Sequence, residues 1–152
     1  AQTPAFLLVT PEDLHPESLL GASAKINGAG MLLDPETLGG DNARAFVAGA
    51  VHDAAERVGN NFKCPTHVLN NLDGASLIAQ ACETGAKQII TAYAPVGPVA
   101  DALARIAPSL ASAGIPLVHI RRAWDERFWP HATKGFFPFK ERIPKILQDM
   151  GI

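Results

Sequence analysis

The sequence predicts an α/β fold, in which a five-stranded parallel sheet carries helices on both faces and an irregular aromatic tail follows. Short apolar runs alternate with helix-like stretches along residues 1–120. Each run is about five residues long and continuous rather than alternating, which is typical of strands covered on both faces of a parallel sheet. Hydrophobic residues make up 47% of the 152 residues and charged residues 18%. We therefore expect one globular domain over 1–152, with a core over 1–120 and a tail over 121–152.

Five apolar runs are the predicted strands. They are Phe6–Thr10, Met31–Asp34, Thr66–Asn70, Gln88–Tyr93 and Pro116–Ile120. Crossovers between parallel strands are right-handed, so this β-α-β pattern predicts a Rossmann-like sheet. Residues 24–30 are interpreted as a loop leading into the second strand, with Gly28 and Gly30 as turn glycines.

Three helices and one short helical piece connect these strands. The first helix is expected to begin at a cap on Asp41 or Asn42, to run over 45–59 and to end at Gly59. Its predicted inner face holds five apolar residues. They are Phe46, Ala50, Val51, Ala54 and Val58. The short piece is Pro16–Leu20.

The second helix is predicted over 74–85 with Asp73 as its cap. Four residues are expected to face inward, namely Leu77, Ile78, Ala81 and Cys82. The third helix is predicted to begin at Pro98 and to end at Gly114, with Pro108 kinking or splitting it.

Composition and motifs exclude several function classes. The net charge of −2 gives no basic excess for a nucleic-acid backbone, and no apolar run reaches the roughly 20 residues of a membrane span. The patterns GxGxxG, GxxxxGK[ST], GxSxG, CxxC and HxxxH are absent. We therefore predict no catalytic residue and no metal site. The two cysteines are interpreted as reduced thiols, which predicts a cytoplasmic protein.

A ligand site is predicted at the carboxyl ends of the strands, where open parallel sheets bind ligands. The candidate ligand-binding residues are Thr10, Asp13, Asp34, Asn70, Asn71, Tyr93 and Arg121. The other interpretation stays open: the acidic residues that follow strands are helix caps, and the rest are solvated loop ends.

Residues 121–152 differ in composition from the rest of the chain. They hold both tryptophans, four of the seven phenylalanines and seven of the thirteen Lys and Arg residues. Arginines with stacking tryptophans suit a phosphate or carboxylate ligand, whereas buried aromatics suit packing or a protein interface; the second interpretation is favoured. The candidate interface residues are Arg122, Trp124, Arg127, Phe128, Trp129, Phe136, Phe137 and Phe139. Only residues 143–150 are predicted to form a regular helix there.

The order of elements resembles the amino-terminal α/β domain of the photolyase and cryptochrome family. Residues 6–20 (FLLVTPEDLHPESLL) resemble its first strand and following loop, and residues 66–93 resemble a strand, helix and strand with an L-x-x-L-A-x-x-x-G-A pattern. Residues 42–59, 103–120 and 133–147 are similar to later segments of that domain. In the first loop only Asp13 and Leu14 match, because the basic R-R-D-L-R signature of typical photolyases is absent.

The resemblance implies a stand-alone domain, because the family's flavin is held by a helical domain that this sequence lacks. It implies a non-catalytic subunit that binds a protein partner, with a flavin-binding helical subunit as one candidate and a homo-oligomer as another. A flavin or antenna chromophore is implied by resemblance only, with no residue assigned to it. The alternative is a domain that binds a nucleotide, flavin or antenna chromophore at the strand ends.

Overall fold

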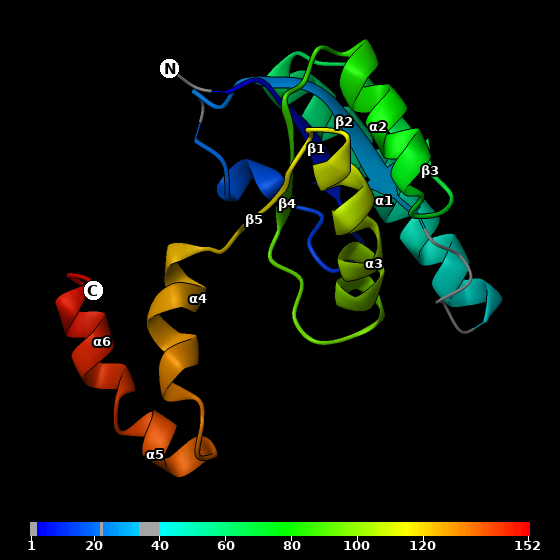
Figure 1. The fold of residues 1–152 in the computed structure, drawn as a ribbon. Coiled ribbons are helices and arrows are strands. Elements are labelled where there is room, and N and C mark those ends of the chain that lie inside the picture. The colour runs from blue at the N-terminus through cyan, green and yellow to red at the C-terminus, as the bar shows by residue number, and fades with distance from the viewer. Residues whose placement is uncertain (1–2, 22, 34–39) are drawn as a thin grey trace. The chain divides into compact units, whose positions relative to one another are not determined.

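The computed structural model describes residues 3–21, 23–33 and 40–152. The chain divides into two compact units, an α/β unit (Ala1–Ile120) and a helical unit (Arg121–Ile152). Figure 1 shows the elements of both units.

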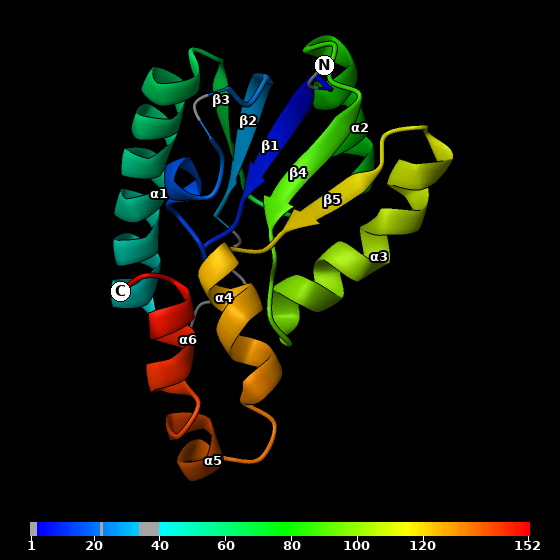
Figure 2. The same cartoon turned by 90° about the vertical axis from the view of Figure 1, so that its left-hand side faces the viewer.

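The α/β unit is built on a five-stranded sheet in which every pair of neighbouring strands is parallel. The strands are β1 (Ala5–Val9), β2 (Ile26–Leu32), β3 (Thr66–Leu69), β4 (Gln88–Ala92) and β5 (Leu117–Ile120). Their order is β3-β2-β1-β4-β5, and Figure 2 shows this sheet with β1 at its centre. The predicted fold class is confirmed: the protein has a Rossmann-like α/β fold.

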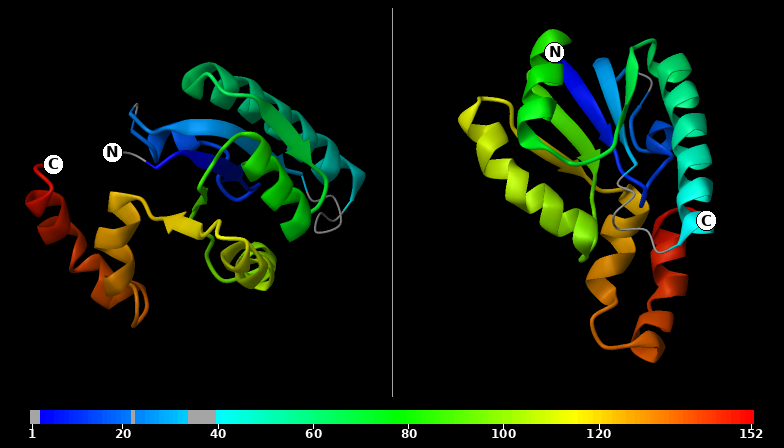
Figure 3. Two further views of the ribbon diagram at one scale, coloured as in Figure 1. Left: turned by 45° about the horizontal axis from the view of Figure 1, so that its top comes forward. Right: turned by 90° about the vertical axis from the view of Figure 1, so that its right-hand side faces the viewer.

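Helices cover both faces of the sheet. On one face lie η1 (Pro16–Ser18) and α1 (Asp41–Phe62), and on the other lie α2 (Gly74–Glu83) and α3 (Pro98–Ser112) (Figure 3). Side chains of β1 alternate between two apolar cores, since Leu7 packs with the α1 side and Phe6 and Leu8 with the α2–α3 side. All five residues of β1 are buried, which explains its unbroken apolar run.

Strand β2 begins earlier than predicted, and the expectation that Gly28 and Gly30 are turn glycines is wrong. Both lie inside β2, and the ring of Phe6 on β1 packs against them. A Cβ atom would stand 3.3 Å from that ring at Gly28 and 3.1 Å from it at Gly30. The glycines are therefore needed for the close approach of a neighbouring aromatic side chain.

Helix α1 differs from the prediction at both ends. Gly40 rather than Asp41 or Asn42 occupies the cap position, and the helix runs past Gly59 to Phe62. Of the predicted inner face, Val51, Ala54 and Val58 are buried and Ala50 is half-buried. Phe46 is 76% exposed, whereas the neighbouring Val47 packs against the core, so the inner face of the first turns holds Val47 and not Phe46.

Helix α2 has the predicted cap. The Asp73 carboxylate accepts hydrogen bonds from the backbone N–H groups of Ala75 (3.4 Å) and Ser76 (2.9 Å). Leu77 and Ala81 are buried as expected and Ile78 is half-buried, but Cys82 is exposed, contrary to the prediction. It lies beyond the edge of the stripe that Leu77 and Ala81 turn toward the sheet.

Helix α3 is continuous from Pro98 to Ser112, so Pro108 does not split it. The hydroxyl of Ser112 donates a hydrogen bond of 2.9 Å to the carbonyl of Pro108. The edge strands β3 and β5 are not covered as fully as the continuous runs predicted. Val68 and His119 are exposed, because an outermost strand has a neighbour on one side only.

The helical unit is not the irregular tail that the sequence predicted. It consists of α4 (Ala123–Phe128), η3 (Trp129–His131), α5 (Phe136–Lys140) and α6 (Ile143–Asp149). The predicted final helix over 143–150 is confirmed as α6. Pro130 and Pro144 stand in the first turns of η3 and α6, where proline begins a helix instead of breaking one.

Candidate functional site

The loop after β1 holds two of the predicted ligand residues in a tight turn. The backbone N–H of Asp13 donates to the carbonyl of Thr10 (3.1 Å), and the Asp13 carboxylate accepts from the N–H of His15 (3.2 Å). Thr10 is buried and Asp13 half-buried. Both residues thus shape the turn at the carboxyl end of the central strand.

The remaining predicted ligand residues are spread along the sheet. Asn70 and Asn71 are exposed after β3, and Tyr93 follows β4, with its N–H donating to the carbonyl of Ile120 (2.8 Å). Strands β3 and β4 are separated by two others, which places their ends about 14 Å apart. The structure therefore does not bring the asparagines next to Tyr93. Asp34 lies outside the described residues, and Arg121 belongs to the helical unit.

The loops after β1 and β4 meet at the centre of this edge. The carboxylate Oε1 of Glu12 lies 4.0 Å from the position that a Cβ atom on Gly97 would take. Gly97 is the cap of α3, so an acidic side chain stands at the start of that helix. The sequence places Glu12 at the strand ends, although it was not among the predicted ligand residues; that it lies beside Gly97 follows from the pairing of β1 with β4.

The described loops after β1, β3 and β4 offer no positive charge to a phosphate. The segments 10–15, 70–73 and 93–97 contain Glu12, Asp13 and Asp73 and neither Lys nor Arg. Hydrogen bonds from the hydroxyl and the backbone N–H of Ser76 hold the pKa of Asp73 below its usual range. These described loops of the α/β unit therefore present carboxylates rather than cations.

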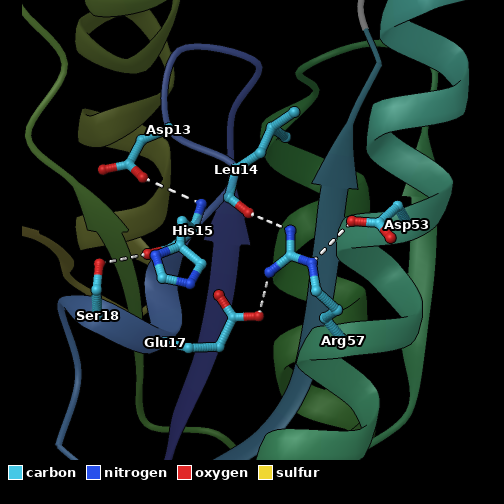
Figure 4. Close-up of polar contacts among 7 residues, drawn as sticks. All are labelled: Asp13, Leu14, His15, Glu17, Ser18, Asp53 and Arg57. Atoms are coloured by element: carbon cyan, nitrogen blue, oxygen red, sulfur yellow. Dashed lines mark hydrogen bonds and ion pairs between the residues drawn. The ribbon is translucent and has the colours of Figure 1, made fainter.

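Arg57 fixes the loop after β1 onto α1 (Figure 4). Its guanidinium donates to Asp53 (2.8 Å), to the carbonyl of Leu14 (2.8 Å) and to the carboxylate of Glu17. The hydrogen bond to Asp53 is the main cause that raises the pKa of Arg57, and Glu17 adds to it. Helical i, i+4 spacing could have predicted the contact with Asp53, whereas Glu17 lies 40 residues away.

An apolar groove lies within the helical unit. It has a volume of about 480 Å³, and we call it the aromatic groove. Its lining residues are Trp124, Asp125, Phe128, Trp129, Ala132, Phe139, Ile143 and Leu147. Phe128 is buried at its base, with its ring 4.5 Å from that of Trp124 and 6.2 Å from that of Phe139.

Four large aromatic side chains of the helical unit are exposed. Trp124 is 49% exposed and Trp129 41%, and both line the groove. Phe136 and Phe137 are 64% and 76% exposed, and their rings meet edge to face at 5.7 Å. Of the other predicted interface residues, Arg127 is exposed, while Arg122 and Phe139 are half-buried.

The sequence did not predict that α6 forms one wall of the groove. Ile143 and Leu147 line it from that helix, at the i, i+4 spacing of one helix face. The spacing was available in the sequence as a signal. What could not be read from it was the packing of α6 against α4.

Arg121 places a positive charge beside the groove. Its guanidinium carbon lies 5.4 Å from the centre of the Trp129 ring, within the range of a cation–π contact. Residues 121–152 hold seven Lys and Arg against four Asp and Glu, a formal net charge of +3. The helical unit as a whole is therefore basic, with Arg121 beside the groove, while the one charged residue in the groove lining is Asp125.

One hollow of the α/β unit lies at the edge of the sheet opposite the predicted ligand site. It has a volume of about 230 Å³ and lies at the amino ends of β1, β2 and β4. Its lining includes Thr3, Ala5, Lys25, Ile26 and Gln88. No group of three or more His, Cys, Asp or Glu residues suited to a metal ion occurs within 3–21, 23–33 and 40–152. Across the same ranges, no helix has the length and apolarity that a membrane span requires.

No protein-family model matches this chain, and no curated protein matches it. Among solved structures, the chain is similar to the E. coli tRNA N6-threonylcarbamoyladenosine dehydratase TcdA in complex with AMP, at 21% identity and a TM-score of 0.40. That alignment covers 76% of this chain and 49% of TcdA; a second TcdA structure, also called CsdL, gives the same identity and TM-score over 48% of its chain. This chain thus spans about half the length of those proteins. Neither is a photolyase or cryptochrome, and the resemblance to that family stays a prediction.

Proposed function

We propose that this chain is a non-catalytic protein-binding module whose helical unit docks another protein through its aromatic surface. The observation that carries the proposal is the exposure of Trp124 and Trp129 in the lining of one apolar groove, with Phe136 and Phe137 exposed on the same helical unit. Tryptophan, phenylalanine and arginine are the residue types enriched at the centres of protein interfaces. Contiguous exposed apolar surface of this kind marks an interaction site.

The size of the helical unit supports the same function. It comprises 32 residues (121–152), and units of fewer than about 40 residues rarely bury enough apolar surface alone. Within residues 121–152, only the side chain of Phe128 is buried. Further apolar surface from outside the unit would complete its core, and a bound protein supplies such surface.

The photolyase resemblance adds a candidate partner, a separate flavin-binding helical subunit. This finer identification depends on the resemblance alone. A second copy of this chain is the other candidate from the sequence.

The test is site-specific photo-crosslinking in cells at two equally exposed phenylalanines. Phe137 in the helical unit and Phe46 in α1 are both 76% exposed, so each is replaced in turn by a photoreactive phenylalanine analogue. We expect one crosslinked protein from position 137 and none from position 46. Mass spectrometry identifies that protein, and the purified pair must then bind each other in solution.

Two further results decide the outcome. Trp129→Ala should abolish both the crosslink and the binding of the purified pair, and nuclease treatment should leave the crosslink intact. Equal crosslinking from positions 46 and 137, or a purified pair that does not bind, would show that the aromatic surface is not a docking site.

A second candidate function is small-molecule binding at the carboxyl edge of the sheet. The chain continues from β1 to β2 and β3 on one side of the sheet and from β4 to β5 on the other. Open parallel sheets bind ligands at the point where the strand order reverses in this way. The meeting of Glu12 with Gly97 at that edge favours it. Absorption and mass spectrometry of whatever denatured protein releases test this function. A nucleotide, flavin or pterin lost on Asn70→Ala or Thr10→Ala would support it, and unchanged content in both variants would exclude it.

A further inference from the structure

We propose that the aromatic groove receives one amphipathic helix of the partner, with an apolar stripe flanked by carboxylates. The inference rests on the proposed function and names the chemistry that this surface recognises. Its physical basis is the shape of the groove, the nature of its walls and the charge that surrounds it.

Helices α4 and α6 form two walls of the groove, and Trp129 of η3 and Phe139 of α5 add to its lining. Helix α4 contributes Trp124 and Phe128, and α6 contributes Ile143 and Leu147. The two helices contact each other, and α5 contacts α6. An amphipathic helix laid along such walls inserts residues at i, i+3, i+4 and i+7, and its apolar face completes a three-helix core.

The lining selects aliphatic and aromatic side chains. Asp125 is the only charged residue among the eight that line the groove, and six of the eight are large and apolar. The volume of about 480 Å³ falls within the range of pockets that enclose a small group of side chains. A partner residue that enters must therefore be apolar.

The net positive charge of the helical unit and the position of Arg121 favour acidic over basic flanks, with Asp125 as the one opposing charge in the lining. The helical unit has a formal net charge of +3, and Arg121 stands over Trp129 at the groove wall. Carboxylates beside the apolar stripe of the partner would meet this positive field, which speeds association and fixes the register.

The charge argues against a second copy docked through its own helical unit, and the aliphatic wall argues against nucleic acid, although positive charge alone would attract it. A second copy would bring another helical unit with a net charge of +3, and like charges would face each other. Single-stranded nucleic acid stacks its bases on open aromatic platforms, whereas this recess has an aliphatic wall of Ile143 and Leu147.

The test uses the full chain and three synthetic helical peptides. The first carries leucines at i, i+3, i+4 and i+7 with glutamates on both flanks. The second replaces the glutamates by lysines, and the third scrambles the leucines. Both tryptophans of the chain line the groove, so intrinsic fluorescence reports its occupation directly.

We expect a saturable shift of tryptophan emission to shorter wavelength with the glutamate peptide alone. The lysine and scrambled peptides should bind at least about tenfold more weakly, and salt should weaken the glutamate peptide. Arg121→Glu should reduce its affinity about tenfold, whereas Arg105→Glu on the exposed side of α3 should leave it unchanged. Leu147→Asp tests the apolar wall, and circular dichroism verifies that each variant is folded.

Each other outcome overturns the inference in a distinct way. Equal binding of the glutamate and lysine peptides would remove the role of charge, and no emission shift with any peptide would exclude a helix as the occupant. A dimer that Leu147→Asp dissociates would assign the groove to a second copy. Tighter binding of an oligothymidylate than of the glutamate peptide would assign it to nucleic acid. A crosslinked protein at position 137 that the glutamate peptide fails to displace would overturn this inference while the proposed function stands.

Discussion

The guanidinium of Arg121 lies over the indole of Trp129, with 5.4 Å between the guanidinium carbon and the ring centre. The contact joins the first residue of the helical unit to the wall of the aromatic groove. It keeps a positive charge beside an apolar recess, and it holds the face of Trp129 in a defined orientation. Loss of this contact is therefore expected to affect the groove more than the α/β fold.

Arg121→Gln should weaken binding of the glutamate-flanked peptide by up to about fivefold, because an exposed ion pair between Arg121 and a peptide carboxylate contributes at most about 1 kcal/mol. Tryptophan emission titrations measure the change. Arg105→Gln removes an exposed arginine from α3 and should leave the affinity as it is. Equal losses in both variants would mean that net charge, and not the position of Arg121, controls binding.

Gly28→Ala should destabilise the α/β unit by about 1–3 kcal/mol, the usual cost of an extra methyl group in a packed core. The new Cβ would stand 2.7 Å from the methyl group of Thr84 and 3.3 Å from the Phe6 ring. Thr84 cannot move aside freely, since its hydroxyl donates to the carbonyl of Gln80 and its own carbonyl accepts from Asn27. Urea denaturation measures the loss.

Gly49→Ala is the matched control for that substitution. Gly49 lies inside α1 with no atom within 4 Å of an added Cβ, so alanine should stabilise the protein by about 0.5–1 kcal/mol through its helix propensity. A stability gain at Gly28 as well would contradict the packing of Phe6 against β2.

These glycines also show where sequence reasoning reached its limit. Strand β1 could be predicted because its burial on both faces leaves a continuous apolar run. The start of β2 could not, since Gly28 and Gly30 read as turn residues until Phe6 from another strand is placed against them. Asp73 was predicted correctly because a helix cap depends only on the next three residues.

The candidate site divides along the same line. The aromatic composition of residues 121–152 directed attention to Trp124, Phe128 and Trp129, which line the groove. That α6 supplies the opposite wall depends on tertiary packing, as does the ion pair of Arg57 with Glu17 across 40 residues. Phe46 was misplaced because the apolar neighbours Phe46 and Val47 both fit a helical stripe with Val51, Ala54 and Val58, and only the packing shows that Val47 lies on the inner face.

Arg57→Ala should lower the free energy of unfolding by about 1–3 kcal/mol, because it leaves the largely buried Glu17 carboxylate and the Leu14 carbonyl without this donor. Amide hydrogen exchange in residues 10–18 should accelerate more than exchange in β4. Arg44→Ala removes an exposed pair with Asp41 and should change stability by at most about 0.5 kcal/mol. Equal effects of the two variants would argue against the Arg57 contacts as the anchor of this loop.

The Asp73 cap should make part of the stability depend on pH in the acid range. Hydrogen bonds from Ser76 lower the pKa of Asp73 in the folded protein. Its contribution is therefore complete above the unfolded value of roughly 3.9 and is lost as the pH falls through the lower folded value. The stability difference between the native protein and Asp73→Ala, measured by thermal unfolding, should shrink over that window.

Ser76→Ala is the control for this titration. It removes the hydroxyl that donates to Asp73 at 2.7 Å, so the acid loss of stability should be smaller and should be complete at a higher pH than in the native protein. An Asp73→Ala difference that stays constant from neutral to acid pH would show that the carboxylate does not act as the cap in solution.

The two thiols test the orientation of α2 independently. Cys82 is exposed on that helix, whereas Cys64 is half-buried and burial raises the pKa of its thiol. Since the thiolate is the reactive form, iodoacetamide at neutral pH should modify Cys82 first and Cys64 later, with the Cys64 rate rising further as the pH increases. Cys82→Ser should remove the fast phase and Cys64→Ser the slow phase. If Cys82 reacted slowly instead, α2 would have to be rotated so that Cys82 joins Leu77 and Ala81 against the sheet.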